Sequence, residues 1–154
     1  MNAIKHPIKR SFVFFLVPDF TMVAFATALD PLRLANRMLG YPAYTWRLAS
    51  YDGKPVRASN GVSVSVDTSL EEERRKMAGP DRPSMVIVCS GIDVEKYQNK
   101  SVFAWLREEY NRGVAIGGLY LLKRSLHVKL AADVSPSDLE NMFLKPRGLG
   151  HDQA

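Results

Sequence analysis

The stretch Gly113-Val-Ala-Ile-Gly-Gly-Leu-Tyr120 contains the pattern that decides the fold. The residues 114–116 form a short apolar run bounded by glycine, which is typical of a strand buried on both faces of a parallel sheet. In an α/β sheet, the residues that follow such a strand lie at the ligand crevice. Because Gly117 and Gly118 permit a sharp turn, the pattern predicts a strand-to-helix elbow with Tyr120 in the nucleophile position. A buried strand that ends in an ordinary loop is an equally open interpretation.

The residues that could supply a nucleophile or a base are poorly suited to catalysis. A tyrosine has an ordinary pKa of about 10, so Tyr120 would be a weak nucleophile at neutral pH. The one cysteine, Cys89, ends an apolar run, which favours an inert core thiol. The histidines lie toward the two ends of the chain, with no spacing that suggests a dyad or a metal site: His6, His127 and His151. We therefore expect no catalytic residue, no metal and no cofactor.

Composition indicates one soluble globular domain. The chain has 154 residues, of which 46% are hydrophobic and 24% are charged, and its net charge of +5 is not clustered in a basic stripe. Charge therefore does not imply nucleic-acid binding. A single cysteine fits a reducing compartment. The apolar run 12–17 is too short for a signal peptide or a membrane span, so we expect a cytoplasmic protein without membrane contact.

Strand and helix patterns alternate along the chain. Apolar or alternating runs predict strands at 12–17, 44–50, 62–66 and 85–89, the last three flanked by turn signals. Helical spacing predicts helices at 22–39, 69–77 and 101–110. Within these, we expect Pro31 to break or kink the first helix, the charged second helix to present a solvated face, and Ser101 to cap the third. Alternation without a repeat predicts a three-layer α/β sandwich with a mostly parallel sheet.

Several of these segments, taken in order, carry a family resemblance. They are 12–19 with Ala28-Leu-Asp-Pro-Leu-Arg-Leu-Ala-Asn36, then Ser50-Tyr-Asp-Gly53, Ala58-Ser-Asn-Gly61, Val86-Ile-Val-Cys-Ser-Gly91 and 113–119. The set resembles the amidotransferase-like sensor domain of AraC-family transcription regulators. That domain is similar to the ThiJ/PfpI branch of the class I glutamine amidotransferase-like superfamily, which has a flavodoxin-like fold. The resemblance covers about residues 11–119.

The chain departs from the family after residue 119. The family pattern continues with Cys-Thr-Gly opening a helix and later with a helix-turn-helix domain, whereas this chain has Tyr120-Leu-Leu and no paired helical pattern in its last 34 residues. We therefore expect a sensor domain at 11–119 that is incomplete at its C-terminus, followed by a divergent, loosely ordered tail at 120–154. Such a departure is what a truncated or frame-disrupted gene product would show.

The resemblance implies a non-catalytic, ligand-sensing and dimerising domain of a transcription regulator without its DNA-binding half. The expected partners are a small-molecule effector and a second copy in a homodimer, with DNA bound only through the absent helix-turn-helix domain. An amidase or hydratase-like enzyme of the ThiJ/PfpI type is the alternative, and a non-functional gene fragment with open sheet edges is a third possibility.

Five residues are expected to line the ligand crevice at the strand ends: Asp19, Asp30, Gly91, Gly118 and Tyr120. Two of them have an equally good structural interpretation. Gly91 could donate its backbone N–H to an oxyanion or could simply be a turn glycine. Asp30 could place a carboxylate at the crevice or could cap a helix kink at Pro31.

Overall fold

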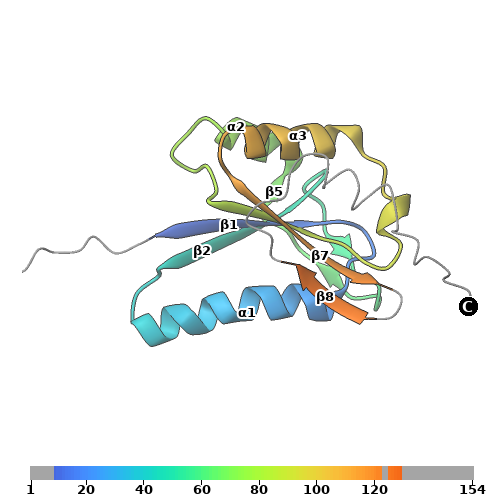
Figure 1. The fold of residues 1–154 in the computed structure, drawn as a ribbon, viewed down its shortest axis with the longest axis horizontal. Coiled ribbons are helices and arrows are strands. Elements are labelled where there is room, and N and C mark those ends of the chain that lie inside the picture. Colours follow the sequence, from blue (N-terminus) through green and yellow to red (C-terminus); the bar gives the residue numbers. More distant parts are fainter. Residues whose placement is uncertain (1–8, 123–124, 130–154) are drawn as a thin grey trace, which may run out of the picture.

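The computed structural model describes residues 9–122 and 125–129, which form a six-stranded sheet between two layers of helices (Figure 1). The strands lie in the order β5-β2-β1-β6-β7-β8, and every neighbouring pair is parallel except β7 and β8. Their bounds are β1 Arg10–Leu16, β2 Tyr44–Ser50, β5 Thr68–Ser69, β6 Met85–Cys89, β7 Ala115–Leu122 and β8 Ser125–Lys129. A separate two-stranded hairpin pairs β3, Val56–Arg57, with β4, Ser63–Val64.

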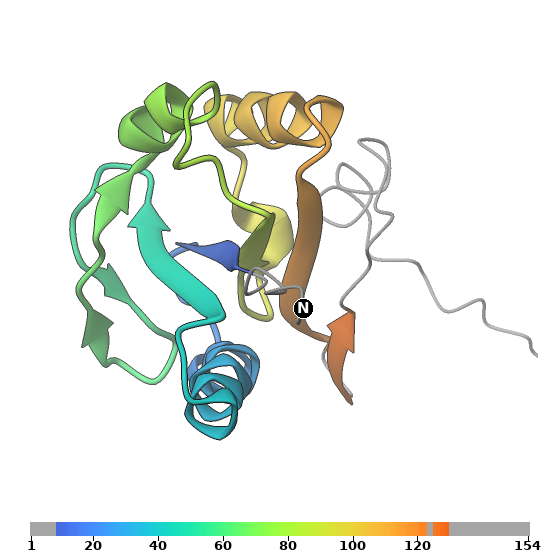
Figure 2. The same cartoon turned by 90° about the vertical axis from the view of Figure 1, so that its left-hand side faces the viewer.

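Helices cover both faces of the sheet. Figure 2 shows α1 against one face and the other two α-helices side by side against the opposite face. Their bounds are α1 Met22–Leu39, α2 Leu70–Lys76 and α3 Lys100–Asn111, with a short 3-10 helix, η1, at Val94–Lys96. The predicted three-layer α/β sandwich with a mostly parallel sheet is therefore confirmed.

The central strand β1 shows why the sheet is buried on both sides. Val13 and Phe15 pack in the core layer under α2 and α3, whereas Phe14 and Leu16 pack in the layer over α1. All four side chains are fully buried or nearly so. Successive side chains of a strand point to opposite faces, so an unbroken apolar run is what a central strand of such a sheet requires.

The first helix has the predicted bounds, 22–39, but the predicted break at Pro31 is wrong. Pro31 lies inside an uninterrupted α1. Proline removes the hydrogen bond to the carbonyl four residues earlier, here that of Thr27. Because Thr27 and Pro31 are both exposed, water can solvate that carbonyl. Gly40 ends the helix as predicted, with a left-handed φ of 76°.

The other two helices begin at side-chain caps. In α2, the Ser69 hydroxyl accepts from the Glu72 N–H while the Glu72 carboxylate accepts from the Ser69 N–H, which completes a capping box. In α3, the Asn99 side chain accepts from the N–H groups of Ser101 and Val102. The prediction of Ser101 as the cap is therefore wrong by two residues, because Asn99 already satisfies the first free N–H groups.

The glycine pair that predicts an elbow instead lies in the middle of a strand. β7 runs without a turn from Ala115 to Leu122, and Gly117 and Gly118 pair in register with Ile87 and Val88 of β6. On its far side, β7 pairs with β8. The predicted turn is therefore wrong: pairing of both glycines with β6, and of Gly118 with β8 as well, holds them in an extended conformation that glycine readily permits.

The predicted boundary between a sensor domain at 11–119 and a tail at 120–154 stays a prediction. β7 crosses that position, β8 follows it, and residues 130–154 lie outside the described part of the structure. Among the described helices, none is long and apolar enough to cross a membrane.

Candidate functional site

The strand order reverses between the carboxyl ends of β1 and β6. From β1 the chain moves outward in one direction to β2, and from β6 it moves in the other direction to β7. In open α/β sheets, ligands bind where the strand order reverses in this way. The loop after β1 contains Asp19, and the loop after β6 contains Gly91, so two of the sequence-predicted residues flank this point. We call the ends of β1, β6 and β7 with these two loops the rim.

Backbone hydrogen bonds fasten the two loops to each other. The Val17 N–H donates to the Cys89 carbonyl at 2.9 Å, and the Thr21 N–H donates to the Ser90 carbonyl at 3.2 Å. The hairpin β3–β4 adds a third support, because the Asp19 N–H donates to the Arg57 carbonyl at 2.9 Å. The loop that carries Asp19 is therefore held from both sides.

Asp19 and Gly91 come into direct backbone contact. Asp19 has a left-handed φ of 62°, a conformation that aspartate tolerates better than most residues. Gly91 is buried beneath it, and a Cβ atom at Gly91 would lie 2.2 Å from the Asp19 carbonyl oxygen. This position therefore requires glycine for close approach of two loops, which gives the turn-glycine interpretation a physical basis.

β7 joins the rim through Ser90. Both the N–H and the hydroxyl of Ser90 donate to the Leu119 carbonyl, at 2.8 and 3.0 Å. Gly118 is buried one residue earlier, opposite Val88, and Tyr120 follows Leu119 in the strand. The structure thus brings the backbone of Gly118 and Tyr120 to the same rim as Asp19 and Gly91.

Asp30 is the one predicted site residue that the structure places elsewhere. It lies eight residues after the start of α1, which is about 12 Å along the helix axis from the rim. Its side chain is exposed and forms a 3.3 Å ion pair with Arg33. Periodicity along a helix does not fix how far a residue lies from the sheet end, so the sequence alone could not separate Asp30 from Asp19.

The Cys89 thiol and the Ser90 hydroxyl, at the end of β6, are both buried. Cys89 is buried, and burial raises the pKa of its thiol far above the ordinary value, so the predicted core thiol is confirmed. Ser90 is buried with its hydroxyl donated to Leu119. His127, on β8, is the register partner of Tyr120 on β7, a pairing that its distance in sequence from the predicted elbow did not suggest. His6 and His151 lie outside the described residues.

Two buried carboxylates lie away from the rim, under α2 and α3, and the sequence interpretation missed both. Glu73 of α2 is fully buried and accepts two hydrogen bonds from the Arg47 guanidinium, at 2.6 and 2.7 Å. The Thr68 hydroxyl donates to the same carboxylate at 2.7 Å. The predicted solvated face of α2 is therefore wrong at Glu73, because Arg47 on β2 supplies the compensating charge.

Glu109 of α3 is the second buried carboxylate. One oxygen accepts from the Trp105 indole N–H at 3.2 Å, and among the described residues the other oxygen has no hydrogen-bond partner. Burial raises the pKa of Glu109; the Trp105 hydrogen bond opposes the shift, and the nearby Glu73 carboxylate adds to it. Glu73 and Glu109 both follow apolar neighbours at spacings of three and four, from Leu70 and Trp105, and this spacing was the signal that could have revealed them.

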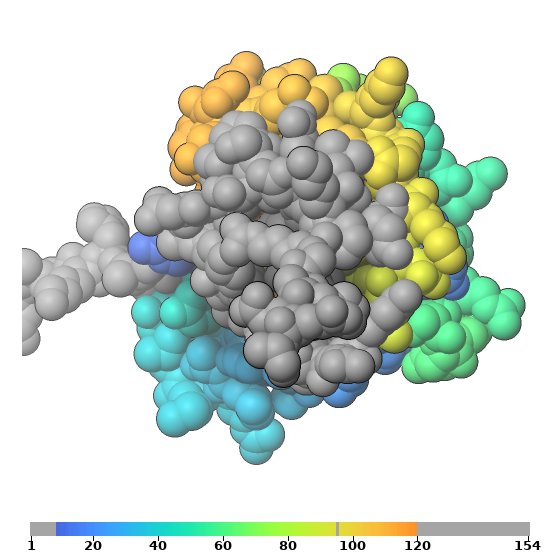
Figure 3. All heavy atoms as spheres, turned by 45° about the vertical axis from the view of Figure 1, so that its right-hand side comes forward, coloured from blue at the N-terminus to red at the C-terminus, as the bar shows by residue number. Residues whose placement is uncertain are grey.

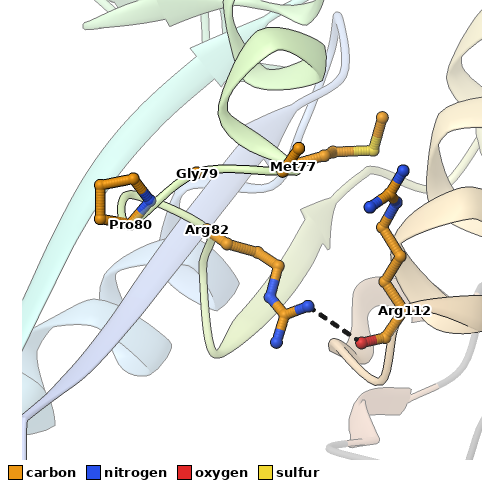
Figure 4. Close-up of a pocket in the computed structure, with 6 residues that line it drawn as sticks. Met77, Gly79, Pro80, Arg82 and Arg112 are labelled. Atoms are coloured by element: carbon orange, nitrogen blue, oxygen red, sulfur yellow. Dashed lines mark hydrogen bonds between the residues drawn. The ribbon is translucent and has the colours of Figure 1, made fainter.

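A hollow of about 450 Å³ lies near the opposite, amino-terminal ends of β6 and β7. Its lining comes from the loop after α2 and from the end of α3: Met77, Ala78, Gly79, Pro80, Arg82 and Arg112. Figure 4 shows the Arg82 guanidinium donating to the Arg112 carbonyl, a 3.3 Å bond that joins the two sides of the hollow. This hollow is basic and separate from the rim.

Comparison with curated proteins identifies relatives of one kind. The chain is 34% identical over 112 residues to the HTH-type transcriptional regulator CdhR from Pseudomonas aeruginosa, and the match covers 73% of this chain and 31% of the relative. It is 31% identical over 113 residues to the HTH-type transcriptional regulator GbdR of the same species, covering 71% of this chain and 28% of the relative. The chain thus spans about a third of the length of the relatives it matches. No protein-family model matches it.

Solved structures agree with the fold. An AraC family transcriptional regulator from Pseudomonas putida superposes with a TM-score of 0.61 at 22% identity, covering 71% of this chain and 64% of that one. A ThiJ/PfpI family protein from Pseudomonas syringae superposes with a TM-score of 0.51 at 11% identity, covering 71% and 41%. The curated relatives confirm the predicted resemblance to transcriptional regulators, and the solved structures show that an AraC family regulator and a ThiJ/PfpI family protein share the fold.

Proposed function

We propose that this chain is a non-catalytic, ligand-sensing and dimerising domain of an AraC-type transcriptional regulator. The observation that carries the proposal is the 34% identity to CdhR over 112 residues, since that relative is named as a transcriptional regulator. The match covers 31% of the relative, which leaves ample length for a DNA-binding part outside the matched region. We therefore assign DNA binding to a helix-turn-helix domain of the kind that such regulators carry, and not to the helices described here.

The rim supports effector binding at the strand ends. It combines an exposed carboxylate, Asp19, with the closely packed backbone of Gly91, the buried Gly118 and Tyr120 on the adjoining strand. Ligand sites of this kind of sheet need few polar groups on a rigid frame, and here two fastened loops provide the frame. Asp30 is exposed on α1 and pairs with Arg33, so we leave it out of the proposed site.

The same rim gives little support to the enzyme alternative. Hydrolysis in ThiJ/PfpI-type enzymes needs a thiolate on an elbow, and β7 has neither an elbow nor a cysteine at this position. Cys89 is buried in the core beside the rim, with a thiol pKa that burial raises. A ligand bound here would therefore be sensed and not turned over.

A ligand screen by thermal unfolding tests this function. The purified full chain is heated with a panel of small amines, carboxylates and neutral metabolite-sized compounds, and a true effector raises Tm in proportion to the logarithm of its concentration. Asp19→Asn keeps a residue that tolerates the left-handed backbone and removes the carboxylate charge, so it should reduce the response to a charged effector. Glu108→Gln removes an exposed carboxylate on α3, away from the rim, and is the matched control that should leave the response unchanged.

Three results would count against the proposal. A panel in which no compound shifts Tm would contradict ligand sensing, and equal responses in Asp19→Asn and the wild-type chain would contradict the rim as the site. A chain without a cooperative unfolding transition would instead favour the gene-fragment interpretation.

A further inference from the structure

The outward side of α1 exposes large apolar side chains. Four of the seven large hydrophobic residues that are exposed in the described structure lie on this helix: Val23 at 57%, Leu34 at 47%, Met38 at 89% and Leu39 at 51%. Figure 3 shows α1, coloured blue to cyan, at the lower surface of the molecule. Single exposed apolar residues are ordinary, but a group on one helix indicates an interaction surface.

Most of these side chains lie along one stripe of the helix, together with two opposite charges. Val23, Asp30 and Arg37 are spaced by seven residues, and Leu34 lies four residues after Asp30. At 3.6 residues per turn these positions share one side of α1, opposite the buried Phe25. Met38, four residues after Leu34, extends the stripe toward the end of the helix. We call Val23, Asp30, Leu34, Arg37 and Met38 the α1 stripe.

The charges of the α1 stripe are arranged symmetrically about Leu34. Asp30 precedes Leu34 by about one turn and Arg37 follows it by about one turn, so the two charges lie roughly 10 Å apart along the axis. Both side chains are exposed, and Arg37 forms no ion pair with any residue of the described part of the chain. Among those residues, Asp30 forms an ion pair only with the similarly exposed Arg33.

This arrangement is complementary to itself. When two such helices meet antiparallel about a two-fold axis beside Leu34, the Leu34 side chains of the two copies become neighbours. The same operation brings Asp30 of each copy opposite Arg37 of the other, which forms two symmetric ion pairs around an apolar centre. An isologous contact needs such self-complementarity, because the same surface of both copies must match itself.

We propose that the α1 stripe is a homodimer interface, in which α1 packs antiparallel against α1 of a second copy with Asp30 facing Arg37 across the two-fold axis. The inference rests on the dimerising part of the proposed function and assigns it a surface. Another protein would require a complementary surface of its own, whereas a second copy already provides the matching charges. The interface is centred on Leu34, about 18 Å along α1 from the helix start that follows the rim, so two bound effectors would remain accessible.

Sedimentation of the full chain over a concentration series tests this interface. The wild-type chain should sediment as a dimer that dissociates on dilution. Leu34→Glu places two carboxylates beside the axis and should yield a monomer at every concentration. Asp30→Arg and Arg37→Asp each set like charges opposite one another, and each should weaken the dimer roughly tenfold.

The charge-swapped double variant decides the geometry. Asp30→Arg combined with Arg37→Asp restores opposite charges across the axis and should recover dimerisation to within about threefold of the wild-type chain. Circular dichroism checks that α1 stays folded, and Glu108→Gln, an exposed change on α3 at the opposite face of the sheet, serves as a neutral control.

Each contrary result overturns a defined part of the inference. A wild-type chain that is monomeric throughout, or a Leu34→Glu variant that still dimerises, rules out this interface. A double variant that stays as weak as its parents rules out the antiparallel pairing of Asp30 with Arg37. The thermal response to ligand is measured separately. A chain that binds an effector but does not dimerise would rule out this interface and would leave the ligand-sensing proposal standing.

Discussion

The backbones of Gly91 and Asp19 approach so closely that a Cβ atom on Gly91 would lie 2.2 Å from the Asp19 carbonyl oxygen. The two residues follow neighbouring parallel strands, and their loops are held together by the Val17 and Thr21 hydrogen bonds to the β6 end. The nearest obstacle to a side chain is backbone, which cannot rotate aside as a side chain can. The geometry of the rim therefore depends on the absence of a side chain at residue 91.

We expect Gly91→Ala to lower the free energy of unfolding by about 1–3 kcal/mol, because the added methyl group must push the two loops apart. Urea denaturation of the purified chain measures this change. Gly79→Ala is the matched control, since the nearest atom to its Cβ would be the Lys76 carbonyl oxygen at 3.8 Å, an ordinary contact. It should change stability by less than about 0.5 kcal/mol. Equal stability of the two variants would mean that the loops separate without cost.

Elements with strong local signals were predictable from the sequence. The bounds of α1, β2 and β6 coincide with the predicted ranges, because helical spacing, strand alternation and flanking glycines determined each one locally. The conformation of Gly117 and Gly118 was not predictable in this way. Paired glycines permit a turn and an extended strand alike, and only pairing with β6 on one side and β8 on the other selects the strand.

Removal of the Arg47 guanidinium should destabilise the chain strongly. Arg47→Ala leaves the fully buried Glu73 carboxylate without its two guanidinium hydrogen bonds, so we expect a loss of about 3–5 kcal/mol in the free energy of unfolding. Arg75→Ala removes an exposed guanidinium that pairs with Glu71 and should cost less than about 1 kcal/mol. Chemical denaturation of both variants provides the comparison. Similar losses in the two would contradict a special role for the buried pair.

The buried pair also shows what the sequence could not reveal about the charged helix. Glu73 stands in a run of six charged residues, and a run of this kind usually faces solvent. Its partner Arg47 lies 26 residues earlier on a different element. Helical spacing from Leu70 could place Glu73 on the inward face, but only the folded sheet brings a guanidinium to it.

Glu109 should make stability depend on pH. Its folded-state pKa is raised by burial, so the folded chain binds its proton more tightly than the unfolded chain does. This contribution to stability is fully present below the ordinary carboxyl pKa of about 4.3 and is lost as the pH rises through the raised value. The Glu73 carboxylate adds to this rise in the pKa of Glu109, whereas the positive charges of Arg82 and Arg112 oppose it.

Glu109→Gln should remove the loss of stability with rising pH, because glutamine carries no titratable proton. Its amide oxygen can still accept from the Trp105 indole N–H. We expect the variant to be more stable than the wild-type chain at neutral pH and close to it at acidic pH. Denaturation across the pH range measures the difference. Glu108→Gln changes the exposed neighbouring carboxylate and should leave the pH profile as it is. A profile that is the same in wild type and Glu109→Gln would assign the pH dependence to other groups.

Tyr120 should not support amidase, protease or hydratase turnover. It occupies a strand that pairs with β6 and β8, so its backbone lacks the turn that projects a nucleophile from an elbow. Losing a covalent nucleophile commonly removes several orders of magnitude in rate. Tyr120→Cys should therefore also be inactive. A thiol alone does not create an elbow, because the chain continues as strand through Leu121 and Leu122. The test is a turnover assay with activated amide and ester substrates on both proteins, and activity of the native chain that disappears in Tyr120→Phe would establish an enzyme instead.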